Sequence, residues 1–393
     1  MLTTLEQALQ IVLNNLPLVG SENVGLIAAT GRVLAQDVIA DIHMPPFDKT
    51  AMDGFACRME DIGNVLEVIT VIAAGEEPLI TIGSHQCAKI MTGAKMPKGA
   101  DCVLMIEDTQ AIGERFIRFV KEKTSRNICY LGEDVQKDAL VLQKSILIQP
   151  QHIAVLATFG CAQPLVSQKV RIAIMATGDE LVEPENTPSS SQIRNSNAWQ
   201  LMAQAARLPV EVHYPGIIQD QEIKTFEAVI NVLKENDLLI ITGGISMGDY
   251  DRVPDALLRA GFRFHFRSLA VQPGRPTIFA TNPEGKVCFA LPGNPVSSFN
   301  QFELLVKPAI YRMMGHEYQP TEYLVSLAQD YHRKKSERLT IIPVRINQAG
   351  EAEVVEYHGS AHINALTHAQ AMMFVLQGVT HIVKGEKVRV RQI

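Results

Sequence analysis

Apolar runs that alternate with amphipathic stretches constrain the fold of residues 170–315 more than any other feature of the chain. Residues 170–177 and 237–242 are almost continuous apolar runs, as expected of strands buried on both faces. Stretches with apolar residues at helical spacing lie between such runs, for example at 223–233. Parallel strands need crossover helices of this kind, so we predict a doubly wound parallel α/β sheet. Ligands bind at the carboxyl ends of the strands in such sheets.

The flanking sequence has a different character, which indicates a multidomain protein. Thr3 and Glu6 form a capping-box pattern before an amphipathic helix, and short β-rich pieces follow it. We predict a helical frame over residues 1–170 with a β-rich insertion at about 48–140. We expect the α/β domain to span 171–318 and a β-barrel-like domain to span 319–393.

Composition argues against several classes of protein. The net charge is −6 and no basic stripe is present, which argues against a nucleic-acid partner. No apolar run approaches the ~20 residues of a membrane helix, and the N-terminus lacks the basic region of a signal peptide. The six cysteines are scattered without a C-x-x-C pair, which argues against a disulfide framework. We therefore expect a soluble, cytoplasmic protein with no membrane partner.

Four loops rich in glycine and proline adjoin predicted strands of the α/β domain. They are residues 177–180, 242–244, 272–276 and 291–295. Glycine lets backbone N–H groups approach a ligand closely, and helix N-termini favour anions. Four such loops on one rim predict a ligand that carries phosphate. The stricter nucleotide motifs G-x-x-x-x-G-K-[ST] and G-x-G-x-x-G are absent from the sequence.

Carboxylates gather near the same turns. They are Asp179, Glu180, Asp220, Asp249 and Asp251, with Asp53 and Asp134 in glycine-flanked settings nearer the N-terminus. Such residues are often solvated or cap helices, and Asp220 is also a candidate N-cap. Carboxylates beside a phosphate repel it unless a cation intervenes, so we predict Mg²⁺ bound by Asp220 and Asp251.

Residues 244–248 spell G-x-S-x-G, the pattern of a serine-hydrolase nucleophile elbow centred on Ser246. An elbow needs a helix directly after the serine, and Pro254 disfavours a helix that starts at Ser246. The histidines further along the chain have no distinctive setting. We therefore interpret Ser246 as a hydrogen-bond donor to a ligand.

Seven ordered motifs across nearly the whole chain resemble the MoeA/gephyrin-type molybdopterin molybdenumtransferase family. They are DKTAMDGFA (48–56), MTGA (91–94), GEDV (132–135), TGDEL (177–181), GGISMG (243–248) with Asp251, PGRP (273–276) and LPGNPVS (291–297). The resemblance implies the last step of molybdenum cofactor synthesis, in which molybdate is inserted into adenylylated molybdopterin and AMP is released. It also implies a homodimer whose active site lies between two subunits, and transient contact with the adenylyltransferase and with molybdoenzymes.

The family's functional residues carry over to matching positions of this chain. The expected catalytic residues are Asp53, Thr92, Asp134, Glu180, Asp220 and Asp251. The expected ligand-binding residues are Thr177, Asp179, Gly243, Gly244, Ser246, Gln272, Arg275, Pro276, Gly293, Asn294, Ser297, Arg338 and Ser360.

The chain departs from the family pattern at three places, all of which bear on anion affinity. Gln272 and Arg275 stand where many members have lysines, and Pro254 replaces a lysine after the Asp251 motif. Arg194-Asn-Ser-Asn197 replaces a Y-D-T-N pattern, so Arg194 is a candidate compensating cation.

Two other functions fit parts of the resemblance. One is a non-catalytic scaffold of the same fold, which would carry a long linker and an extra fused domain, and the sequence has neither. The other is an adenylyltransferase that acts one step earlier, against which the additional N- and C-terminal domains argue.

Overall fold

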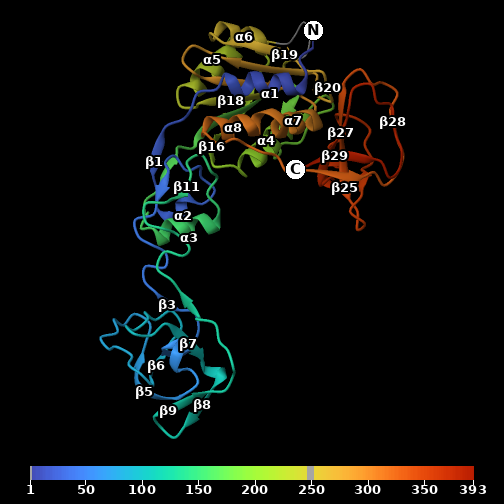
Figure 1. The fold of residues 1–393 in the computed structure, drawn as a ribbon. Coiled ribbons are helices and arrows are strands. Elements are labelled where there is room, and N and C mark those ends of the chain that lie inside the picture. The colour runs from blue at the N-terminus through green and yellow to red at the C-terminus, as the bar shows by residue number, and fades with distance from the viewer. Residues whose placement is uncertain (1, 246–251) are drawn as a thin grey trace. The chain divides into compact units, whose positions relative to one another are not determined.

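The protein is described by a computed structural model that covers residues 2–245 and 252–393. The chain forms two compact units (Figure 1). The larger unit contains residues up to 35, 145–149 and 164–393, and the smaller unit contains residues 36–144 and 150–163. The smaller unit is thus inserted into the chain of the larger one. The division of the chain into three domains at the expected bounds stays a prediction.

A seven-stranded sheet forms the centre of the larger unit. In spatial order its strands are β16 (Val210–His213), β13 (Val170–Thr177), β18 (Leu238–Thr242), β22 (Val287–Leu291), β21 (Pro276–Thr281) and β19 (Arg263–Ser268), and β17 (Ile217–Ile218) also pairs with β13. The pairings among β16, β13, β17, β18 and β22 are parallel, as the sequence predicts. β21 and β19 run antiparallel, so the sheet is mixed at one edge.

The continuous apolar runs arise because both faces of this sheet are covered by helices. Successive residues of β13 enter different cores: Ile172 and Ile174 pack on one face, whereas Ala173 and Met175 pack on the other. The first face is covered by helices α1 (Leu5–Asn14), α4 (Asn197–Ala205) and α8 (Lys307–Met313), and by the segment that follows α7 (Pro295–Gln301). The second face is covered by α5 (Glu222–Leu233) and α6 (Val253–Arg259). This arrangement is the three-layer α/β/α architecture.

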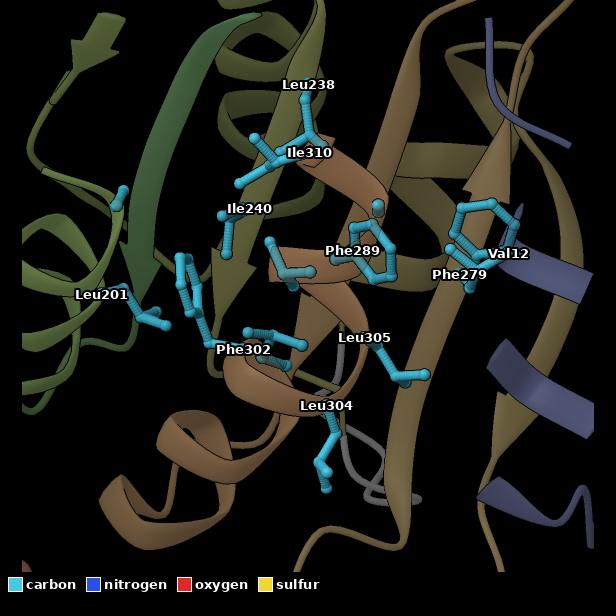
Figure 2. Close-up of a cluster of buried hydrophobic side chains, with 14 of the residues drawn as sticks. Val12, Leu201, Leu238, Ile240, Phe279, Phe289, Phe302, Leu304, Leu305 and Ile310 are labelled. Carbon is cyan, nitrogen blue, oxygen red and sulfur yellow. The ribbon is translucent and has the colours of Figure 1, made fainter. Parts of the chain in front are cut away.

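Large side chains from sheet and helices fill the first core. Figure 2 shows Phe279 and Phe289 on the strands near Phe302 and Ile310 of the helical layer. The Phe279 and Phe289 rings lie 5.0 Å apart between centroids. α7 continues through a π-helical turn (Phe302–Val306) into α8, where Pro308 lacks the N–H that a regular helix would need.

The second β region of the larger unit is formed mainly by the C-terminal residues. Its strands are β20 (Val271–Gln272), β25 (Leu339–Ile346), β27 (Ala371–Val375), β29 (Lys387–Gln392), β23 (Glu322–Ser326) and β26 (Ala352–Val354). A bridge between Leu327 and Ala352 joins the end of β23 to β26, which closes a ring around a buried apolar core. The expected barrel-like form is therefore present. β24 (Tyr331–His332) and β28 (His381–Ile382) form a separate pair, and α9 (Asn364–Thr367) is a short helix.

One strand joins this second sheet from an unexpected position in the chain. Residues 262–271 (FRFHFRSLAV) predict a single strand, but the structure divides this segment into β19 and β20. β20 pairs in parallel with β25 rather than with the α/β sheet. The chain therefore enters the C-terminal sheet once before it returns to the α/β sheet as β21.

The smaller unit contains a six-stranded sheet and two separate short strand pairs. In order the strands are β7 (Cys102–Met105), β4 (Gly54–Cys57), β6 (Gln86–Ile90), β5 (Val65–Ile72), β9 (Phe116–Phe119) and β8 (Thr109–Ile112). The remaining elements are β2 (Val38–Ile39) with β11 (Leu140–Leu142), β3 (Lys49–Thr50) with β10 (Ile128–Cys129), the 3-10 turns η1 (Met59–Asp61) and η2 (Ile106–Asp108), and α3 (Pro150–Thr158). Phe55 and Ala56 of β4 belong to different cores, so both faces are buried.

Two helix starts differ from the sequence prediction by one position. The capping box of α1 is formed by Thr4 and Gln7, not by Thr3 and Glu6. The N-cap of α5 is Gln221, so Asp220 precedes the cap and is not the N-cap.

The larger unit also contains β1 (Ser21–Asn23) paired with β12 (Leu165–Ser167), β14 (Leu181–Val182) paired with β15 (Ile193–Arg194), and α2 (Leu26–Ala29). Within the described ranges, every helix is too short or too polar to cross a bilayer.

Candidate functional site

The four glycine- and proline-rich loops meet at one edge of the α/β sheet. The parallel strands β13, β18 and β22 end there at Thr177, Thr242 and Leu291. β21 begins at the same edge, because it runs antiparallel to β22 and Ile278 pairs with Ala290. The sequence predicts that all four loops share one rim, and the strand directions place them there.

Gly243 and Gly244 turn directly against the end of β13. Both have positive φ, +95° and +61°. A Cβ at Gly243 would lie 2.4 Å from the Thr177 carbonyl oxygen, and one at Gly244 would lie 2.7 Å from Thr177 Oγ1. Only glycine fits this close approach of two loops. The Gly243 N–H donates to the Leu291 carbonyl oxygen at 3.2 Å, so this amide is already used inside the rim.

Asn197, at the start of α4, links two of the loops and was not predicted as a site residue. Its Nδ2 donates to the Gly293 carbonyl oxygen at 2.7 Å and to Thr242 Oγ1 at 3.2 Å. In the part of the chain that the structure describes, its Oδ1 and the Oγ1 of Thr177 are buried without a hydrogen-bond partner. Buried polar atoms are normally paired, so these two point to a polar ligand at the rim. The only sequence signal for Asn197 was the changed 194–197 motif.

Three of the expected acids lie beside the same rim. The Asp220 N–H donates to Asp179 Oδ1 at 3.2 Å, and Asp220 Oδ1 would lie 3.6 Å from a Cβ at Gly244. The Glu180 carboxylate folds back over the turn, since a Cβ at Gly178 would lie 2.5 Å from Glu180 Oε2. Asp251 and Ser246 lie outside the described residues.

A cleft of about 1090 Å³ lies where the rim loops meet the C-terminal sheet. Residues expected at the site that line it are Gln272, Arg275, Pro276, Asn294, Ser297, Arg338 and Ser360. The C-terminal contribution is held in place by hydrogen bonds to α7: Asn294 Nδ2 donates to Ser360 Oγ at 2.9 Å and the Val296 N–H donates to the Ser360 carbonyl oxygen at 3.1 Å. Arg338 Nη1 donates to the Val271 carbonyl oxygen at 3.3 Å. The cleft thus joins residues far apart in the sequence.

The cleft is rich in positive charge and in protonated hydroxyl groups. Arg333, Lys334 and Lys335 line it together with Arg275 and Arg338. These three were not predicted, although the run HRKK at 332–335 was a visible signal. Burial raises the pKa of the Tyr357 phenol in the cleft to about 12. This hydroxyl therefore stays protonated at neutral pH and can donate to an anion.

Three family models match the chain in order. They are the MoeA N-terminal region (domain I and II) at residues 3–160, a probable molybdopterin binding domain at residues 173–312, and the MoeA C-terminal region (domain IV) at residues 325–393. The chain belongs to the MoeA family. The resemblance seen in the seven motifs is thereby confirmed.

Proteins related to this MoeA chain are similar to it over almost their full length. A protein of Staphylococcus epidermidis named molybdopterin molybdenumtransferase is 34% identical over 378 residues, which is 94% of this chain and 90% of the relative. A Staphylococcus aureus protein of the same name is 32% identical over 383 residues, which is 95% of this chain and 91% of the relative. A crystal structure of the molybdopterin biosynthesis MoeA protein of Pyrococcus horikoshii superposes with a TM-score of 0.86 at 28% identity and covers 100% of both chains. The multidomain α/β fold class is confirmed by this match.

The remaining expected acids of this MoeA chain belong to the smaller unit. The Asp53 carboxylate accepts hydrogen bonds from the Thr92 N–H at 2.6 Å and from Thr92 Oγ1 at 2.7 Å. These bonds stabilise the ionised form and lower the pKa of Asp53 below its usual range. Asp134 lies in the 131–135 loop, where its N–H donates to the Met44 carbonyl oxygen. The structure therefore brings Asp53 and Thr92 into direct contact, whereas the rim acids belong to the larger unit.

Replacing Thr92 by valine is expected to raise the pKa of Asp53. The hydroxyl bond is lost and the carboxylate loses part of its stabilisation, whereas Thr92→Ser retains the hydroxyl and should leave the pKa almost unchanged. A ¹³C NMR titration of the Asp53 carboxyl carbon measures both. Because the folded pKa is lowered, this group contributes stability above the ordinary pKa of about 3.9 and loses it as pH falls through the lowered pKa. An identical titration curve in Thr92→Val and wild type would contradict this assignment.

The three departures from the family pattern lie in different surroundings. Gln272 lines the cleft. Pro254 lies in the first turn of α6, which begins at Val253, and proline suits that position. Arg194 donates through Nε to the Asn186 carbonyl oxygen at 3.1 Å and is not among the residues that line the cleft.

Proposed function

We propose that this chain is a molybdopterin molybdenumtransferase that inserts molybdate into adenylylated molybdopterin and releases AMP. Its membership of the MoeA family and its similarity to proteins of that name over more than 90% of the chain support the proposal. The observation that carries it is the cleft between the rim loops and the C-terminal sheet. Every substrate and product of the reaction is an anion, and the cleft has five cationic side chains on its walls: Arg275, Arg333, Lys334, Lys335 and Arg338.

These cations differ in the role that their contacts permit. Arg333 donates to the carbonyl oxygens of Val379 and Leu376 at 2.5 Å each, so it shapes the wall. Arg275 is exposed to the cleft, and Arg338 keeps donors besides the one bonded to Val271. Guanidinium groups bind oxyanions through two parallel hydrogen bonds. We assign Arg275 and Arg338 to the oxyanions of molybdate and phosphate, with Gln272, Pro276, Ser297 and Ser360 shaping the surrounding pocket.

The rim is assigned to the nucleotide and pterin phosphates. Thr177, Asp179, Gly243, Gly244, Gly293 and Asn294 would contact or position them, together with Ser246. Thr177 Oγ1 and Asn197 Oδ1, which are buried and have no hydrogen-bond partner among the described residues, support a polar ligand there. The Gly243 amide already donates to Leu291, so Gly243 contributes by permitting the close approach of the loops.

We propose that Mg²⁺ is held by Asp220 and Asp251. The oxygen-rich set at the rim fits this ion, because Asp220 and Asp179 lie together beside the Gly244 turn and Mg²⁺ prefers carboxylate and phosphate oxygens. A bound Mg²⁺ would neutralise charge on the pyrophosphate. Glu180 would orient the ligand shell from the same turn.

We also propose that the active enzyme is a cytoplasmic homodimer. Asp53, Thr92 and Asp134 of one subunit would then complete the rim site of its partner, and transient contacts with the adenylyltransferase and with molybdoenzymes would deliver substrate and product. The hydrogen-bonded Asp53–Thr92 pair supports a preorganised carboxylate in this role.

Release of AMP from adenylylated molybdopterin is expected to depend on molybdate. The purified protein is mixed with this substrate and Mg²⁺, with and without molybdate, and AMP is measured by chromatography. A molybdate-dependent rate supports the transferase. The rival is tested with ATP, Mg²⁺ and molybdopterin: accumulation of the adenylylated product without AMP release from it would overturn the proposal in favour of an adenylyltransferase.

A further inference from the structure

Three metal-ligand side chains converge at the β24–β28 pair and are not among the residues that line the cleft. Asp330 directly precedes β24, and His332 is the second residue of that strand. His332 lies directly opposite His381 in the antiparallel register. The two imidazole rings are stacked, with centroids 3.9 Å apart and planes 11° apart. Strand geometry thus gathers two histidines and one aspartate at a single point.

The ligand atoms of this group are close enough to share one ion. One atom from each of Asp330, His332 and His381 lies within 4.8 Å of the others, and this is the only such group of three in the described ranges. Asp330 Oδ2 lies 4.0 Å from His381 Nε2. Bonds of 2.0–2.1 Å place the ligand atoms of a tetrahedral zinc site about 3.4 Å apart, so rotations of these exposed side chains that move the atoms by about 1 Å are sufficient.

The group is held on a firm local scaffold. Asp330 Oδ1 accepts the Lys384 N–H at 2.7 Å, which orients the carboxylate. The Arg333 N–H donates to the Thr380 carbonyl oxygen at 2.9 Å, and the Arg333 side chain binds two further carbonyl groups of the 376–379 segment. Both ligand-bearing segments are therefore tied together without the ion. Tyr331 and Arg333 line the cleft, whereas Asp330 and His332 do not, so the group lies behind the cleft wall.

We propose that Asp330, His332 and His381 form a binding site for a divalent transition-metal ion of the zinc class. Two imidazoles and a carboxylate suit Zn²⁺, Ni²⁺ or Cu²⁺, whereas Mg²⁺ prefers oxygen ligands. All three side chains are exposed, so water completes the coordination. The bound ion links β24 to β28 and braces the wall that carries Tyr331 and Arg333. This site is separate from the Mg²⁺ proposed at the rim, and its test does not depend on the transferase activity.

The test is a calorimetric titration of the full-length, chelator-treated protein with Zn²⁺. Wild type should bind one ion that His381→Ala loses or binds at least 10-fold more weakly, because even second-shell changes cost about 10–100-fold in metal affinity. Asp330→Asn keeps an acceptor for the Lys384 N–H and should also weaken binding. His362→Ala is the matched control, since His362 also belongs to a stacked histidine pair, with His358 at 5.0 Å, outside any such ligand group in the described residues.

A second measurement identifies the ligands without relying on stability. Co²⁺ bound to wild type should give visible absorption bands of nitrogen and oxygen coordination, and these bands should vanish in His381→Ala and persist in His362→Ala. Circular dichroism confirms that each variant is folded. Equal Zn²⁺ affinity in wild type and both ligand variants would overturn the proposal. So would equal loss of binding in His362→Ala, because binding would then not be specific to this group. Cysteine-bound zinc would persist in every variant and would likewise appear as unchanged affinity.

Discussion

Gly243→Ala is expected to lower the rate of AMP release by about 100-fold or more. The new Cβ would lie 2.4 Å from the Thr177 carbonyl oxygen, a backbone atom that cannot move alone, at a φ of +95° that alanine adopts only with strain. The strand-end turn must therefore shift away from β13. A displacement of about 1 Å can cost an enzyme 10²-fold, and this turn carries the expected phosphate site. Steady-state kinetics with adenylylated molybdopterin and molybdate measure the effect.

Gly216→Ala separates backbone strain from the steric clash. Gly216 has a similar φ of +101°, but a Cβ there would meet nothing within 4 Å. This control should lose some thermal stability and keep most of its activity. If Gly243→Ala retained near-normal activity while folded, or if Gly216→Ala lost as much, the rim loop would not be the phosphate site that we propose.

The double variant Arg275→Gln/Arg338→Gln is expected to lose at least about 100-fold in kcat/KM. Both side chains line the cleft, and a hydrogen bond to a charged group contributes about 1.5–3 kcal/mol, or roughly 10–150-fold for each arginine. Glutamine keeps a donor for the Val271 carbonyl that Arg338 contacts, so the fold should be preserved. Initial rates over a range of molybdate concentrations measure the loss.

A matched variant removes the same charge from the surface away from the cleft. Lys234 and Arg263 are exposed and are not among the residues that line it. Lys234→Gln/Arg263→Gln should therefore have nearly wild-type kinetics at the same ionic strength. An equal loss in both double variants would show that overall charge, not the two guanidinium groups of the cleft, recruits the anions.

The parts of the fold that could be predicted are those with a strong local pattern. Strands buried on both faces read as unbroken apolar runs, and so the centre of the α/β sheet was evident at β13 and β18. Strand direction was less accessible, because the apolar residues of β21 do not distinguish it from β22 in the parallel part of the sheet. The division of residues 263–272 between two sheets depends on long-range pairing with β25, for which no local pattern exists.

The candidate site could be predicted where backbone chemistry demanded particular residues. Gly243 and Gly244 are needed for the close contact with Thr177, and so they were visible as a motif. Asn197 is an ordinary helix-start residue until the fold brings it to the Gly293 carbonyl. The cationic wall at 333–335 became meaningful only when the C-terminal sheet was placed beside the rim. Whether Asp220 caps α5 or only positions a ligand could be decided only from the structure, in which the helix begins at Glu222.

The pairing of β20 with β25 limits where the chain can be cut without disrupting its fold. Val271 and Gln272 lie opposite Leu339 and Thr340, and the Leu339 N–H donates to the Ala270 carbonyl oxygen at 3.1 Å. A C-terminal segment separated from the preceding sequence would leave that edge of β25 open, and open edges promote aggregation. The predicted domain border near residue 319 lies between β20 and β25 in the sequence. Cutting the chain there would therefore separate two paired strands of one sheet. A fragment that is to keep this pairing must therefore contain both β20 and β25.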